Sequence, residues 1–206
     1  MTADFRSIRV SRMYRRFHPT SYMDETGHSD DPKFHFAGMA GFVAPAKLWK
    51  ALGKCWEKVL NKFELTEPFH MKEFAHSQGE FKDWKGKEEK RKSLYGKLIE
   101  GIVAVQPQPV GTIVSIEAFR SLSERQQKSF LDPYYVAFQR CTRGAASKGM
   151  FGEPREKVAM VYSYNEEYGA TKSQKEYSVD QAGRAEQLWH MMKKHTDFGP
   201  WMGSYA

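Results

Sequence analysis

Cysteine is scarce in this chain, and long apolar runs are absent from it. The 206 residues contain only two cysteines, Cys55 and Cys141. Their spacing matches no zinc site and no disulfide framework, which indicates a reducing, cytoplasmic setting. No apolar run approaches the roughly 18 to 20 residues that a membrane-spanning helix needs. The sequence therefore predicts a protein without a membrane-spanning helix.

Acidic residues are fewer than basic ones. There are 32 Lys and Arg against 25 Asp and Glu, which gives a formal net charge of +7. Such an excess favours polyanionic partners, because neutralising phosphates releases counterions. The first 18 residues carry five arginines and lack the apolar stretch of a secretory signal. We expect residues 1–18 to form a basic arm and residues 19–206 to form one domain.

The order of the predicted elements indicates an α/β fold. Alternating apolar residues indicate strands, and apolar residues at helical spacing indicate helices. The predicted strands are 20–27, 34–44, 110–119 and 157–169, and the predicted helices are 46–63, 93–105, the segment after Pro133 and 174–195. A charged, aromatic segment at 67–92 is predicted as a functional loop with one helical turn. An initial hairpin followed by helix-linked strands predicts a mixed sheet with crossovers.

The stretch TSYMDETGHSDD, residues 20–31, ends a predicted strand in two acids. One interpretation is an acidic turn, because Asp, Gly and Ser favour turns. A nucleotide-hydrolase strand would need a G-x-x-x-x-G-K-[ST] loop, which the sequence lacks. An aspartyl phosphatase would need a second aspartate where Thr26 stands. The remaining interpretation is a metal-binding carboxylate. Because side chains alternate along a strand, only one of the two acids can point into the site, and we predict that this acid is Asp24 and not Glu25.

Further candidate ligands follow predicted strands or precede predicted helices. Glu117 ends the strand 110–119, and Glu166 follows the apolar part of the strand 157–169. His70 lies in the segment FHMKEF. Divalent cations such as Mg²⁺ or Mn²⁺ need several oxygen ligands in a phosphoryl-transfer site. We therefore predict Asp24, Glu117 and Glu166 as metal ligands, and His70 as a residue that moves a proton or holds a phosphate.

Four segments in order carry a resemblance to a known family. They are MDETGHSDD, FHFAGMAGFV, FHMKEF and MVYSYNEEYG. Over residues 19–206 the chain resembles the domain of unknown function 3800 family. The resemblance implies a ribonuclease H-like mixed sheet flanked by helices and a suspected metal-dependent nuclease activity. It also implies catalytic roles for Asp24, Glu25 and His70.

Two departures from the family pattern bear on activity. Ser163 stands where relatives often carry an acid, and the family's C-terminal helix is missing after Ala206. The domain is therefore expected to be truncated at its C-terminus or to lack a metal ligand. A missing ligand would favour binding without cleavage.

The leading hypothesis is a metal-dependent nuclease or phosphodiesterase that acts on nucleic acid by two-metal phosphoryl transfer. In the segment FKDWKGKEEKRK, aromatic side chains would stack on bases beside cationic phosphate contacts. The predicted nucleic-acid contacts are Lys82, Trp84, Lys85, Lys87 and Arg91. One alternative is a non-catalytic module of the same fold that binds nucleic acid or protein. The other is a metal-dependent hydrolase of a small phosphorylated substrate.

Overall fold

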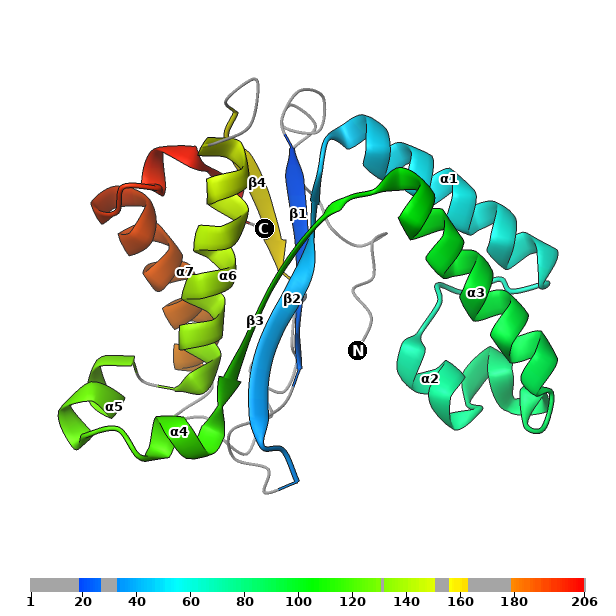
Figure 1. Ribbon diagram of the computed structural model, residues 1–206, viewed down its shortest axis with the longest axis horizontal. Coiled ribbons are helices and arrows are strands. Elements are labelled where there is room, and N and C mark those ends of the chain that lie inside the picture. Colours follow the sequence, from blue (N-terminus) through cyan, green and yellow to red (C-terminus); the bar gives the residue numbers. More distant parts are fainter. Residues whose placement is uncertain (1–18, 27–32, 131, 151–155, 163–178, 206) are drawn as a thin grey trace.

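A five-stranded mixed sheet forms the centre of the molecule (Figure 1). The computed structural model describes residues 19–26, 33–130, 132–150, 156–162 and 179–205. The strands are β1 (Thr20–Thr26), β2 (Phe36–Ala44), β3 (Gln108–Ser115), β4 (Val158–Tyr162) and β5 (Met202–Tyr205), in the order β3-β2-β1-β4-β5. β2 is antiparallel to β1 and β3, and β4 is parallel to β1 and β5. The α/β class is confirmed, and the sheet is consistent with the ribonuclease H-like arrangement.

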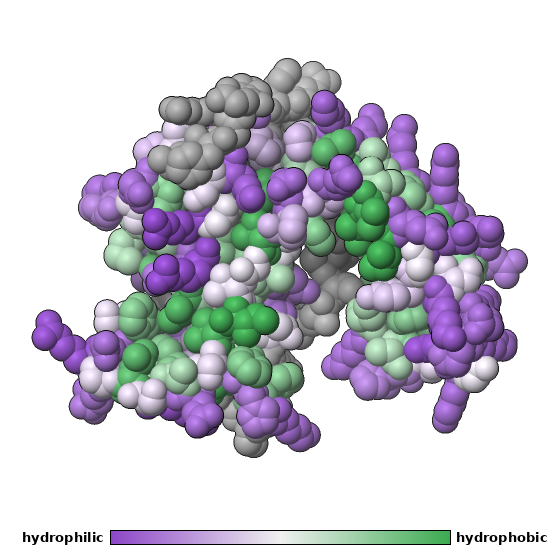
Figure 2. Space-filling view, viewed as in Figure 1, coloured by the Kyte–Doolittle hydropathy of each residue, from purple (hydrophilic) through white to green (hydrophobic). Residues whose placement is uncertain are grey.

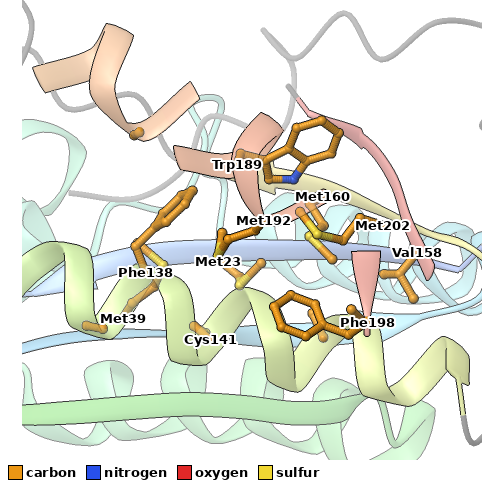
Figure 3. Packing of buried hydrophobic residues seen from close by; sticks show 14 of the residues in the cluster. Met23, Met39, Phe138, Cys141, Val158, Met160, Trp189, Met192, Phe198 and Met202 are labelled. Atoms are coloured by element: carbon orange, nitrogen blue, oxygen red, sulfur yellow. The ribbon is translucent and has the colours of Figure 1, made fainter. Parts of the chain in front are cut away.

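Helices in the second half of the chain cover one face of the sheet. They are α4 (Ile116–Arg120), α5 (Glu124–Phe130), α6 (Pro133–Met150), α7 (Val179–His195) and the short η3 (Gly199–Trp201). Met23 and Met39 of the sheet share a buried core with Phe138 and Cys141 of α6 and Trp189 of α7 (Figure 3). Burial raises the pKa of the Cys141 thiol to about 12. A thiol of that kind is unreactive, so Cys141 serves packing.

The segment between β2 and β3 forms a separate layer on the other side of the sheet, which we call the helical insertion (Figure 1). It contains α1 (Ala46–Lys62), α2 (Met71–His76), the 3₁₀ helix η2 (Gly79–Trp84) and α3 (Glu88–Val105). The insertion has its own buried core, made of Leu65, Phe69, Phe74, Phe81, Trp84, Leu94 and Leu98. Two hydrophobic cores therefore stabilise the described part of the chain, one under α6 and one within the insertion.

The prediction of a loop over 67–92 was wrong, because this segment folds into α2, η2 and the start of α3. Its aromatic side chains are spaced irregularly, so no single long period reveals them, yet they pack together against α1 and α3. The strand predicted over 110–119 ends earlier, at Ser115. The Ser115 hydroxyl accepts a hydrogen bond from the Ala118 N–H (3.2 Å) and caps α4.

None of the described helices is both long and apolar enough to cross a membrane. The longest of them, α3 and α6, have 18 residues each, and charged side chains interrupt both.

Candidate functional site

Asp24 and Glu25 lie near the end of the central strand β1 and point to opposite faces of the sheet. Met23 is buried in the core under α6, so alternation places Glu25 on that face and Asp24 with Tyr22 on the other. The ring of Tyr22 meets that of Trp49 in α1 edge to face, with centroids 4.8 Å apart. Asp24 therefore faces the side of the helical insertion. Its Oδ1 accepts a hydrogen bond from the Glu25 N–H (3.0 Å).

Small residues surround Asp24 on this face. Its partners across the sheet are Ala40 on β2 and then Gly111 on β3, and both are exposed. Phe36 and Ile113 belong to the same face and are 57% and 75% exposed. We call the surface of β2 and β3 around these residues the open face. Figure 2 shows a gap on one side of the molecule between the surface of the sheet layers and that of the helical insertion. Asp24 itself is half-buried.

Glu117 does not share a site with Asp24, and its assignment as a metal ligand with Asp24 was wrong. The register aligns Asp24 on β1 with Ala40 on β2 and with Gly111 on β3, which is two strands from β1. Ser115 lies four residues after Gly111 along β3. Strand spacing and rise then separate the Asp24 and Ser115 Cα atoms by about 16 Å. Glu117 lies beyond Ser115 in α4, which turns toward the α6 side of the sheet (Figure 1). Oxygen ligands lie within about 2.6 Å of the cation that they bind. The carboxylates of Asp24 and Glu117 are therefore too far apart to bind the same cation.

The described residues do not assemble a complete metal site. No group of three or more His, Cys, Asp or Glu side chains within the described ranges could hold a metal ion. β4 ends at Tyr162, which pairs with Met23 on the parallel strand β1, so the carboxyl end of β4 lies beside Asp24. Glu166, the third predicted ligand, lies outside the described residues. Binding of Mg²⁺ or Mn²⁺ therefore stays a prediction, and the described residues do not form a set that fits the ion.

His70 lies in the helical insertion, immediately before α2. Its backbone is extended, its side chain is half-buried, and its carbonyl oxygen accepts a hydrogen bond from the Phe74 N–H (2.9 Å). It follows Phe69, a member of the insertion core. The position of His70 is thus fixed by the packing of the insertion, and its catalytic role stays a prediction.

Trp84 is part of the insertion core, so the prediction that it stacks on bases was wrong. It is 5% exposed, and Phe81 beside it is 1% exposed. The Lys90 Nζ lies 4.0 Å from the centroid of the Trp84 ring. A 3₁₀ helix has three residues per turn, so positions 81 and 84 share one face. That spacing was the sequence signal for burial.

Arg91 is engaged in contacts within the insertion. Its guanidinium lies 4.4 Å from the centroid of the Phe74 ring and donates a hydrogen bond to the Ser77 hydroxyl (3.0 Å). Its side chain is only 13% exposed. Arg91 therefore joins α3 to α2, and the structure does not support the prediction that it contacts nucleic acid.

Lys82, Lys85 and Lys87 project from the insertion where its aromatic residues turn inward. All three are exposed, and within the described residues none of them makes an ion pair. Phe81 and Trp84 occupy the inner side of η2, so Lys82 between them faces solvent, and Lys85 and Lys87 follow η2 at exposed positions. These three predicted nucleic-acid contacts are therefore available to a phosphate backbone.

Glu80 is a structural residue of the insertion that the sequence did not reveal. Its carboxylate accepts hydrogen bonds from the Thr66 N–H (2.9 Å), the Thr66 hydroxyl (2.7 Å) and the Glu67 N–H (3.0 Å). Burial raises the pKa of this carboxyl, but the hydrogen bonds from Thr66 and Glu67 outweigh burial, and the pKa is lowered overall. Glu80 thus ties η2 to the turn after α1.

Glu80→Gln is expected to destabilise the insertion by about 1 to 2 kcal/mol at neutral pH, because it removes the charge from three hydrogen bonds. A lowered pKa means that the stabilisation is present above the ordinary carboxyl value and is lost as the pH falls through the folded-state value. Urea unfolding at neutral and acidic pH would measure both effects. Glu67→Gln, an exposed neighbour, is the control. Equal stability of the two variants at neutral pH would contradict the role of Glu80.

Comparison of the chain with models of protein families, with curated proteins and with solved structures finds no match. The resemblance to the domain of unknown function 3800 family therefore stays a prediction. The described residues define an α/β domain whose mixed sheet carries a helical insertion between two antiparallel strands.

Proposed function

We propose that this chain binds nucleic acid through its helical insertion. The observation that carries the proposal is the exposure of Lys82, Lys85 and Lys87 on an insertion with its own core, with no ion pair to acids of the described residues. Lysines that are not neutralised within the protein can release counterions when they meet phosphates. The net charge of +7 acts in the same direction over longer distances.

Phosphodiester hydrolysis at Asp24 is a second candidate function. Asp24 lies near the end of the central strand, on the open face, with Ala40 and Gly111 as its neighbours across the sheet. A carboxylate beside an open floor can orient a water or accept its proton when a phosphodiester lies there. This activity would rest on binding by the insertion, which lies on the side of the sheet that Asp24 faces (Figure 1).

Salt-dependent binding tests the first proposal. Fluorescence anisotropy with labelled DNA and RNA should give affinities that fall linearly with the logarithm of the salt concentration. A triple variant in which Gln replaces Lys82, Lys85 and Lys87 should have a slope of log affinity against log salt concentration that is smaller in magnitude by about 2 to 3 for duplex DNA. The control replaces Lys92 and Lys128, which pair with Glu89 and Glu124. Absence of salt-dependent binding by the wild-type chain would overturn the proposal.

Mn²⁺ titration of thermal unfolding tests whether Asp24 belongs to a metal site. At about 100 times Kd, binding to the folded state adds roughly 2.7 kcal/mol, and Asp24→Asn should remove this gain. Glu117→Gln is the matched control, because the register separates Glu117 from Asp24 and the gain should persist. A gain that survives Asp24→Asn would place the ion elsewhere. The same pair of variants, assayed on DNA and RNA with Mn²⁺, tests the second candidate function.

A further inference from the structure

α1 carries a row of lysines along one side. Lys47, Lys50, Lys54, Lys58 and Lys62 follow one another at spacings of three or four residues, so they share one face of the helix. All five are exposed, and within the described residues none makes an ion pair. The only acid in α1 is Glu57. We call this row the α1 lysine track.

The apolar side of α1 faces α3, which fixes the direction of the track. A Cβ placed on Gly101 of α3 would lie 3.0 Å from Cys55 Sγ and 3.7 Å from Leu52 Cδ1 and Trp56 Cδ1. These three residues therefore form the contact side of α1. Lys50 and Lys54 lie on the far side of the helix from this contact, and Lys58 and Lys62 lie along its edge, three and seven residues after Cys55. Figure 2 shows hydrophilic surface along the outer side of the insertion.

The composition of the track differs from that of an ordinary solvated face. Exposed helix faces usually mix both signs, and Glu–Lys pairs four residues apart add a few tenths of a kcal/mol each. In α1 the pairs Lys50–Lys54, Lys54–Lys58 and Lys58–Lys62 carry like charges at that spacing, which destabilises the helix by similar amounts. An anionic partner would remove this repulsion, and α3 and α5 show the ordinary pattern through pairs such as Lys92–Glu89 and Lys128–Glu124.

η2 packs beside the end of α1. Phe63, which follows Lys62, contacts Trp84 at the end of η2, with ring centroids 6.0 Å apart. A helix rises 1.5 Å per residue, so lysines four apart repeat every 6 Å or so, and the track spans about 22 Å. Lys82 of η2 and Lys85, which follows it, are exposed near this contact.

We propose that the α1 lysine track is the principal contact for the phosphodiester backbone, with Lys82, Lys85 and Lys87 as further contacts. This inference rests on the proposed nucleic-acid binding and names the surface that performs it. A row of ammonium groups along a rod provides contacts to successive phosphates without reading bases, so the binding is independent of sequence. A lipid surface fits less well, because the apolar side of α1 that would enter a bilayer packs against α3.

The experiment compares three triple variants that change the charge equally. The α1 variant replaces Lys50, Lys54 and Lys58 with Gln, and the η2 variant replaces Lys82 of η2 and also Lys85 and Lys87, which follow it. The control set is Lys92 and Lys128, which pair with glutamates, and Lys194, which is exposed on α7. Gln has nearly the helix propensity of Lys, so folding should persist, and circular dichroism verifies it. Affinity of the full chain for duplex DNA, single-stranded DNA and vesicles of phosphatidylserine and phosphatidylcholine is then measured across a salt series.

The α1 variant should lower the salt slope for duplex DNA by about 2.7, at least as much as the η2 variant does, and the control set should change it least. If the α1 variant keeps the wild-type slope while the η2 variant loses it, the track is overturned and the proposed function stands. If the wild-type chain shows no salt-dependent binding to either DNA, both fail. Stronger binding to the vesicles than to DNA, removed by the α1 variant, would overturn the track as a nucleic-acid surface.

Discussion

Gly41→Ala is expected to disrupt the central sheet, because β1 and β2 approach too closely there for any side chain. A Cβ at Gly41 would overlap the carbonyl oxygen of Tyr22 and lie 2.8 Å from the Met23 Cα. Both are backbone atoms of the central strand, so relief requires a shift of β1 itself. Overpacking of this kind costs about 3 kcal/mol or more, a large part of the stability of an ordinary domain. The melting temperature should fall by roughly 10 °C.

Gly111→Ala is the matched control on the neighbouring strand. A Cβ there would lie 3.4 Å from the Ala40 Cβ, 3.6 Å from the Met39 carbonyl oxygen and 3.8 Å from the Ala40 Cα, all of them ordinary van der Waals contacts. Its stability should stay within about 1 kcal/mol of the wild type, with some gain from the stiffer unfolded chain. Thermal unfolding of the two variants decides the matter. Similar melting temperatures for both would contradict the close approach of β1 and β2 beside Asp24.

Phe81→Ala is expected to unfold the helical insertion and abolish nucleic-acid binding. The centroid of the Phe81 ring lies 5.8 Å or less from the ring centroids of Phe69, Phe74 and Trp84. Removing a fully buried aromatic ring of this size costs about 3 to 5 kcal/mol. Because the insertion has a core of its own, the loss should fall on α1, α2 and α3 more than on the sheet. Hydrogen exchange resolved by segment, together with DNA binding, measures both effects.

Phe36→Ala is the control, since Phe36 lies on the open face and is 57% exposed. Its stability should remain close to that of the wild type. The comparison also tests the placement of Phe81, because a base-stacking residue would lose binding without losing stability. A Phe81→Ala chain as stable as the wild type would restore the stacking interpretation that the structure contradicts.

Local patterns predicted four of the five described strands and the assignment of Asp24 and Glu25 to opposite faces of the sheet. Alternating burial along β1 is a property of a few consecutive residues, so Asp24 and Glu25 could be assigned to opposite faces from the sequence. The mixed sheet also followed from the order of the elements, because helix-linked strands favour crossovers and the first two strands read as a hairpin. The class of fold was therefore accessible before any long-range contact was known.

The candidate site depended on contacts that local patterns do not record. Glu117 looked like a neighbour of Asp24 because each follows apolar strand residues, but the register of β2 against β1 and β3 decides their separation. Phe81 and Trp84 looked like exposed stacking residues because no long helix surrounds them. The α1 lysine track was present in the sequence, yet its direction depends on which side of α1 meets Gly101 in α3.

The chain leaves the sheet for the insertion and returns to it at adjacent positions. Val43, near the end of β2, pairs with Gln108, the first residue of β3. Paired residues on antiparallel strands have Cα atoms about 5 Å apart, a distance that a tight hairpin turn can close. The sheet would thus keep its connectivity if a two-residue turn replaced residues 45–107. The adjacent ends of β2 and β3 and the separate core of the insertion have the same consequence. The insertion is a structural unit that could be gained or lost without a change in strand order.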